Sequence, residues 1–164
     1  MSGTINIANN WSMTGNSIAE WQANLTGDSI ASIQNGIFYA DNIEHRVCQA
    51  IAEVRQTQLS DTWPTFTALK KSYLAIDWLN GHGKITEFTA ELDTLKIAGL
   101  GSINLPTLTF MLDINGQVMG ANNSFNKQKI SDPACAVNAK YQNIQWPVFC
   151  QGKLDNAELT SCKI

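Results

Sequence analysis

Charged residues are scarce in this chain, and their scarcity excludes one class of partner. They make up 15% of the sequence, against roughly a quarter in an average soluble protein. The 11 basic and 14 acidic residues leave a formal net charge of −3, and no basic cluster is larger than the pairs Lys70-Lys71 or Lys127 and Lys129. Because nucleic-acid binding depends on neutralising many phosphates, we expect no nucleic-acid partner.

Long apolar runs are also missing. No run approaches the roughly 18 residues that a membrane helix needs, and the first ten residues lack the charged and apolar regions of a signal peptide. We therefore expect no membrane span in this form of the chain. If the protein is exported, this form has been processed or trimmed, and a leader or N-terminal anchor is missing from it.

Catalytic signatures are absent as well. The sequence has no P-loop, dinucleotide-binding or G-x-S-x-G motif. His45 and Cys48 could share one helical face as a nucleophile pair, but Cys48 is expected beside a buried stripe, where a thiolate is not stabilised. His82 is interpreted as an exposed loop residue. A site built from distant residues would need a pocket that joins either histidine to a carboxylate. We predict a non-enzymatic protein with no catalytic residues and no cofactor.

The four cysteines, Cys48, Cys135, Cys150 and Cys162, indicate an oxidising compartment. Four oxidised cysteines allow three pairings, and we favour Cys135 with Cys150 or Cys150 with Cys162, which leaves Cys48 to join the remaining one. The alternative is four reduced thiols in a cytosolic protein. A zinc site is not expected, because the C-x₁₄-C-x₁₁-C spacing lacks a short knuckle. We predict an extracytoplasmic protein held by disulfides.

Apolar spacing predicts helices in the first two thirds of the chain. Ser17 and Glu20 form a capping-box pattern at the start of the first one. Asn35-Gly36 and Asn80-Gly81 are interpreted as helix ends. The predicted helices cover residues 17–25, 28–35, 39–59, 65–79 and a stretch that begins at Thr86 and ends at Gly99 or Gly101.

From residue 102 onward the pattern changes to β. Strands are predicted at 107–114 and 117–120, joined by a type I′ turn at Asn115-Gly116. Another strand is expected at 141–149, at a sheet edge because Pro147 lacks a backbone donor. The sequence therefore predicts one α+β domain of residues 1–164, mainly helical over 1–101 and mainly β and loop over 102–164, with a helical half packed on a small sheet and a disulfide-stapled tail.

Partner-binding and cation-binding candidates come from the same C-terminal region. Trp63 and Trp146 each precede a proline in an expected loop or edge, where their large apolar area could anchor a protein partner, together with Asn122 and Asn123 in a neighbouring loop. The oxygen ligands of Asp113, Asn115 and Asp132 could bind Ca²⁺, but turn formation explains these residues and the pattern is not an EF-hand. No metal site is predicted.

The segment from Leu108 to Asn122, LTFMLDINGQVMGAN, resembles type IV pilins and type II secretion pseudopilins. Many members carry a strand that ends in a D-[VI]-N-G turn, then a short G-x-N segment and a C-terminal region closed by a disulfide. The resemblance is confined to the C-terminal third. It implies an α+β subunit whose long N-terminal helix packs on an antiparallel sheet, and whose cysteine-bounded region contacts neighbours or targets in a fibre.

Besides an enzyme with a site built from distant residues, the sequence thus leads to two functional hypotheses. The first is an exported pilin-like subunit, a minor pilin or pseudopilin, that acts in fibre assembly, secretion or cell adhesion through other pilus subunits. The second is a periplasmic binding protein, such as an immunity-type inhibitor, that forms a one-to-one complex with a target protein. Both are non-enzymatic and place the protein at the cell surface, in a pilus or in the periplasm.

Overall fold

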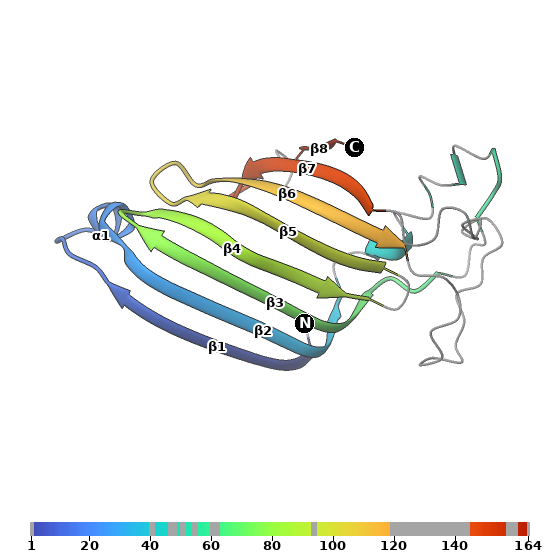
Figure 1. Ribbon diagram of the computed structural model, residues 1–164, viewed down its shortest axis with the longest axis horizontal. Coiled ribbons are helices and arrows are strands. Elements are labelled where there is room, and N and C mark those ends of the chain that lie inside the picture. The colour runs from blue at the N-terminus through green and yellow to red at the C-terminus, as the bar shows by residue number, and fades with distance from the viewer. Residues whose placement is uncertain are drawn as a thin grey trace.

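One antiparallel sheet dominates the molecule. The computed structural model describes residues 2–39, 42–45, 49, 52–53, 56–59, 63–92, 95–118, 145–156 and 161–163. The sheet has eight strands, and their order in space is their order in the sequence (Figure 1). The strands are β1 (Ser2–Ser12), β2 (Thr26–Phe38), β3 (Thr67–Leu79), β4 (His82–Glu91), β5 (Leu95–Asn104), β6 (Thr109–Val118), β7 (Gln145–Lys153) and β8 (Ser161–Lys163).

The described helices are short. The predicted first helix is confirmed as α1 (Ile18–Asn24). Its N-cap Ser17 accepts a hydrogen bond from the Glu20 amide at 3.2 Å, and the Glu20 carboxylate accepts one from the Asn16 amide at 2.6 Å. Of the helix predicted at 39–59, residues 43–45, 49 and 52–53 are helical. No helix within the described residues is long and apolar enough to cross a membrane.

The predicted α+β fold class is wrong. The segments predicted as helices at 28–35 and 65–79 are strands β2 and β3, and the stretch from Thr86 to Gly101 lies in β4 and β5. The N-terminal part is therefore mainly β, and the pairing of β5 with β6 joins it to the C-terminal part in one sheet. The long N-terminal helix implied by the pilin resemblance is absent from the described residues, because β1, α1, β2 and β3 stand where it would run.

The Asn-Gly hairpin lies at a different position from the predicted one. Asn115 and Gly116 are inside β6, which runs unbroken and pairs with β5 on one side and β7 on the other. The two-residue turn is at Asn80-Gly81 instead, where both residues have positive φ (50° and 74°) and Leu79 pairs with His82. This conformation is the one that a type I′ turn requires.

The strand predicted at 141–149 corresponds to β7, which begins at Gln145. The expectation that Pro147 lies at a sheet edge is met, because β8 pairs only with residues 149–151 of β7. Beside Pro147 the outer side of β7 therefore has no partner strand among the described residues, which suits a residue without a backbone donor.

The two faces of the sheet differ in chemistry. Strand pairing aligns side chains of one face in four rows that cross the sheet from β1 to β7, and we call these residues the apolar face. The rows are Ile5, Ile33, Ser72, Ala90, Ile97, Gly116 and Trp146; Ile7, Ala31, Leu74, Phe88, Gly99, Ile114 and Val148; Asn9, Ser29, Ile76, Ile85, Gly101, Leu112 and Cys150; and Trp11, Gly27, Trp78, Gly83, Ile103, Phe110 and Gly152. None of them is charged.

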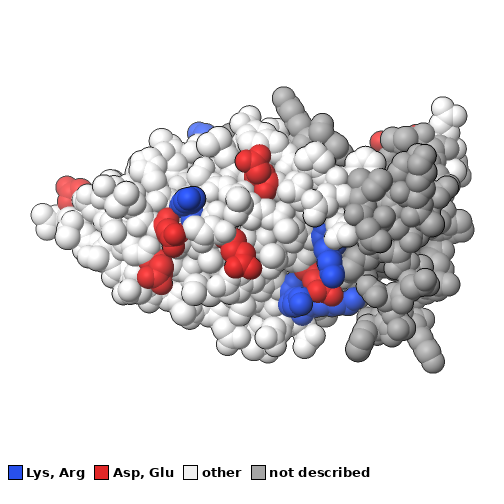
Figure 2. All heavy atoms as spheres, viewed as in Figure 1, with Lys and Arg blue, Asp and Glu red and all other residues white. Residues whose placement is uncertain are grey.

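The opposite face, called the polar face below, carries the charges of these strand segments. Figure 2 shows acidic and basic side chains spread over the face turned toward the viewer. Because side chains alternate along a strand, the register assigns to this face Asp28, Lys71, Asp77, Lys84, Glu87, Glu91, Lys96 and Asp113. The sheet is thus amphipathic across its whole width.

The core lies on the apolar face. Leu25, Ile76, Trp78 and Ile85 form one buried cluster, and Ala90, Leu92 and Leu95 form a second. Extensive contacts between described elements occur only between neighbouring strands of the sheet. The core is therefore made mainly by cross-strand neighbours that pack on one another, and Ile43 of the short helical segment 43–45 packs against the second cluster.

A substitution in the Asn80-Gly81 turn should destabilise the fold. A Cβ at Gly81 would clash with the Gln22 carbonyl oxygen, and the positive φ adds strain. We expect Gly81→Ala to lower the free energy of unfolding by about 2 kcal/mol or more, measured by urea denaturation. Gly116→Ala is the matched control, because its Cβ would meet no atom closer than 3.9 Å. Equal losses in the two variants would contradict this role of the turn.

Candidate functional site

Cys150 is the predicted disulfide residue that the structure describes most fully. It is disulfide-bonded and buried, with 6% of its surface exposed. Its Cα lies opposite that of Cys162 in the β7–β8 register. Opposed Cα atoms in an antiparallel pair are about 4.5–5.5 Å apart, within the range of about 4.4–6.8 Å that disulfides span. Cys48 and Cys135 lie outside the described residues.

The predicted partner-binding residues do not form one separate surface in the described structure. Trp146 is 43% exposed at the start of β7, and it belongs to the apolar face, in the row that contains Gly116. Trp63 is half-buried, and its ring lies against His45 with centroids 5.2 Å apart. Asn122 and Asn123 lie outside the described residues.

The weak Ca²⁺ candidates are not turn residues. Asp113 and Asn115 project from the polar face in the middle of β6, where Asp113 pairs with Leu100 and Phe149. Asp132 lies outside the described residues. Within the part of the chain that the structure describes, no three His, Cys, Asp or Glu side chains gather as a metal site would require.

The two histidines have different surroundings. His45 contacts Trp63 and its backbone amide donates to the Asn42 side chain at 2.8 Å, while Cys48 lies outside the described residues. His82 is exposed at the start of β4, directly after the tight turn. The pocket described below contains neither histidine.

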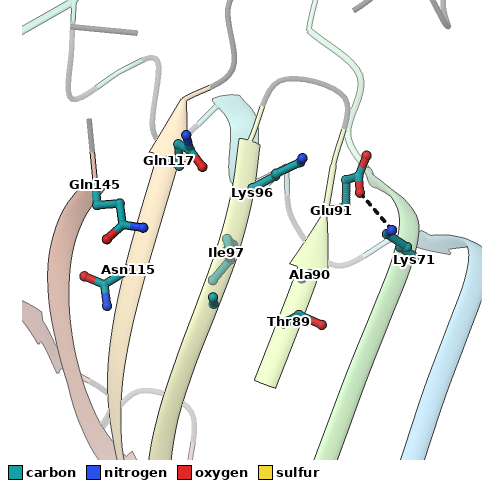
Figure 3. A pocket seen from close by; sticks show the side chains of 10 residues that line it. Lys71, Thr89, Ala90, Glu91, Lys96, Ile97, Asn115, Gln117 and Gln145 are labelled. Atoms are coloured by element: carbon teal, nitrogen blue, oxygen red, sulfur yellow. Dashed lines mark ion pairs between the residues drawn. The ribbon is translucent and has the colours of Figure 1, made fainter. Parts of the chain in front are cut away.

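A polar hollow of about 300 Å³ lies on the polar face (Figure 3). The Lys71 Nζ atom pairs with the Glu91 Oε2 atom at 3.3 Å, and Lys96 follows Glu91 in the same row of the sheet. An ion pair whose lysine is 71% exposed contributes little stability. The remaining lining is Thr89, Ala90, Ile97, Ala98, Asn115, Gln117 and Gln145. The lining contains no histidine, cysteine or serine.

The apolar face is the larger candidate site. Ile76 and Ile85 near its centre are 6% and 4% exposed, but Ile7 and Trp146 toward its two sides are 65% and 43% exposed. Monomeric soluble proteins rarely expose a wide contiguous apolar surface unless it binds something. A half-covered apolar face of this width therefore indicates a binding surface.

Two tryptophans share one hydrogen-bond acceptor on this face. Trp11 and Trp78 both pair with Gly27, from β1 and β3 respectively. Each indole Nε1–H donates to the Ser29 hydroxyl oxygen at 2.8 Å. The rings are thus fixed side by side across β2, and their only donors point at the sheet itself. The resulting surface presents aromatic carbon to its surroundings and no indole donor.

This arrangement was not predicted from the sequence, although one signal for it was available. Ser72, Leu74, Ile76 and Trp78 alternate with Tyr73, Ala75 and Asp77, and Ile5, Ile7 and Trp11 have the same period of two. Read with that period, both segments are strands with one apolar side. The role of Ser29 could not be read from the sequence, because it depends on strand pairing.

Comparisons with known proteins add no family to this description. No family model matches the chain, and no curated protein or solved structure matches it either. The candidate site is therefore argued from its own geometry and chemistry.

Removing the shared acceptor should loosen the tryptophan pair. Ser29→Ala leaves the N–H of the buried Trp78 without its partner, so we expect the free energy of unfolding to fall by about 1–3 kcal/mol, measured by urea denaturation followed by tryptophan fluorescence. Ser32→Ala, on the opposite face of the same strand, is the control and should change stability little. A Ser29→Ala variant as stable as Ser32→Ala would show that the shared acceptor does not matter.

The disulfide pairing stays a prediction that peptide mapping can test. The β7–β8 register favours a link between Cys150 and Cys162. Mass spectrometry of non-reduced peptides should find these two residues in one linked peptide pair. A link between Cys150 and Cys135 or Cys48 would contradict the expectation from the register.

Proposed function

We propose that this protein is a non-catalytic binding protein that holds uncharged hydrocarbon chains against the apolar face of its sheet. The single observation that carries the proposal is the chemistry of that face, whose four rows extend over seven strands without a charged side chain. The charged residues of the same strand segments lie on the other face.

The hydrogen-bonding groups of the apolar face support an apolar occupant. Besides the indole N–H groups of its tryptophans, its polar side chains are Asn9, Ser29 and Ser72, and Ser29 already accepts from the indoles of Trp11 and Trp78. Protein interfaces use about one hydrogen bond per 100–200 Å² of buried surface. A face with so few donors and acceptors suits a ligand that needs none, because a polar partner would lose its bonds to water without replacement.

The expected affinity follows from the area that the ligand hides from water. Burying a CH₂ group completely gains about 0.8 kcal/mol. A chain laid along an open face hides about half of each methylene, so about twenty methylenes would gain about 8 kcal/mol, equivalent to a dissociation constant near 1 μM. The aromatic and branched side chains of β3 to β7 provide the contact surface. Gly99 and Gly101 lie between them, and because glycine has no side chain, nothing projects from the face at these two positions.

The compartment predicted from the sequence is part of the proposal. A disulfide-bonded Cys150 favours an oxidising, extracytoplasmic location. The expectation of protein partners, in a fibre or in a one-to-one complex, is not carried over to the apolar face, because Trp146 is a member of that face and not a separate anchor.

Binding can be tested with diphenylhexatriene, an uncharged hydrocarbon whose fluorescence rises when it leaves water. We expect the protein to bind it with a dissociation constant in the micromolar range. Ile114→Lys places a charge on the apolar face and should weaken binding tenfold or more. Met111→Lys places the same charge on the polar face of the same strand, at a side chain that is 51% exposed, and should leave binding unchanged.

A second variant guards against misfolding of the first. Ile7 is 65% exposed on β1, so Ile7→Lys should fold normally and weaken binding only at the rim of the face, by a few fold. No fluorescence rise with the folded protein, or equal losses in Ile114→Lys and Met111→Lys, would overturn the proposed function.

A further inference from the structure

The two edges of the sheet are protected to very different degrees. β8 is three residues long and pairs with residues 149–151 only. β1 has eleven residues, all of them exposed, and β2 is its only neighbour in the sheet (Figure 1). Along its outer side, backbone donors and acceptors have no strand to pair with among the described residues, so β1 offers a long template for another strand.

β1 also lacks the devices that keep an edge strand single. Natural edge strands are commonly blunted by proline, by charged side chains or by bulges. β1 contains no proline and no charged residue. Its one irregularity falls between Ser2 and Thr4, and the register with β2 is continuous from Thr4 to Ser12. About nine residues at about 3.4 Å each therefore form an unbroken edge of about 30 Å.

We infer that β1 pairs antiparallel with β1 of a second copy of this chain, so that two sheets join edge to edge. Self-pairing brings no like charges together, because the strand is neutral despite the net charge of −3 on the whole chain. A two-fold axis through the strand pair makes the contact self-complementary.

The apolar face favours this occupant over an unrelated strand. Ile5, Ile7 and Trp11 are 48%, 65% and 47% exposed, and all three occupy odd-numbered positions. If the two β1 strands pair so that odd-numbered residues of one copy lie opposite odd-numbered residues of the other, Ile5, Ile7 and Trp11 of both copies lie on the same face. There they cover one another. The dimer would then continue the apolar face from one sheet into the other. This inference does not depend on what the apolar face binds.

Sedimentation velocity over a concentration series tests the pairing. The contact is a single strand pair, so we expect a monomer–dimer equilibrium in the micromolar range. Thr4→Lys/Ala8→Lys places two positive charges on the polar side of β1 and should weaken the dimer tenfold or more, because like charges meet across the axis. Met111→Lys/Asn115→Lys is the control, with the same charges four residues apart on the polar face of inner strand β6, and should dimerise normally.

Hydrogen exchange gives a second readout that needs no variant. As the wild-type concentration rises through the dimer range, amides of residues 4–12 should gain protection while those of β5 do not change. A wild-type monomer at all concentrations, a dimer that survives Thr4→Lys/Ala8→Lys, or a dimer without added protection in β1 would overturn the inference.

Discussion

The fold depends on the pairing register that keeps every apolar row on one side of a single sheet. Side chains alternate along a strand, so a slip of one residue would move a whole strand's apolar set to the other face. The described elements make extensive contacts only with their neighbours in the sheet, so packing from outside the sheet does little to correct such a slip. Register is instead fixed locally, by the tight turn at Asn80-Gly81 and by the glycine opposite each tryptophan in the row of Trp11 and Trp78.

The same constraint links stability to function. The cross-strand contacts that bury Ile76 and Ile85 stabilise the sheet, and the side chains that they leave half-covered form the surface for a ligand. The Ser29 hydroxyl contributes to both, because it orders two indole rings and withdraws their donors from the face. The polar face is hydrated and charged. Solubility and binding are therefore assigned to opposite sides of one layer.

Local signals predicted part of this molecule. The Ser17 cap, α1 and the edge position of Pro147 follow from short-range chemistry, and the structure confirms them. The helices predicted at 28–35 and 65–79 are wrong because both segments pair along their length with other strands, and this pairing decides between helix and strand. In the second segment, the alternation of Ser72, Leu74, Ile76 and Trp78 also fits a period of two. The turn predicted at Asn115-Gly116 rests on the positive φ that this pair tolerates, and it is wrong because pairing with β5 and β7 places both residues inside β6. Gly116 is the small member of a row in which Ile97 and Trp146 are its neighbours.

The central claim is that the uncharged side of this sheet is where an apolar ligand binds. A crystal structure of the protein with a bromine-labelled alkane tests it most directly, because anomalous scattering locates the bromine atoms without reference to the protein. The account predicts bromine peaks over the rows of Leu112, Ile114 and their cross-strand neighbours. Ordered bromine in the polar hollow beside Lys71 and Glu91, or none on the sheet at all, would contradict it.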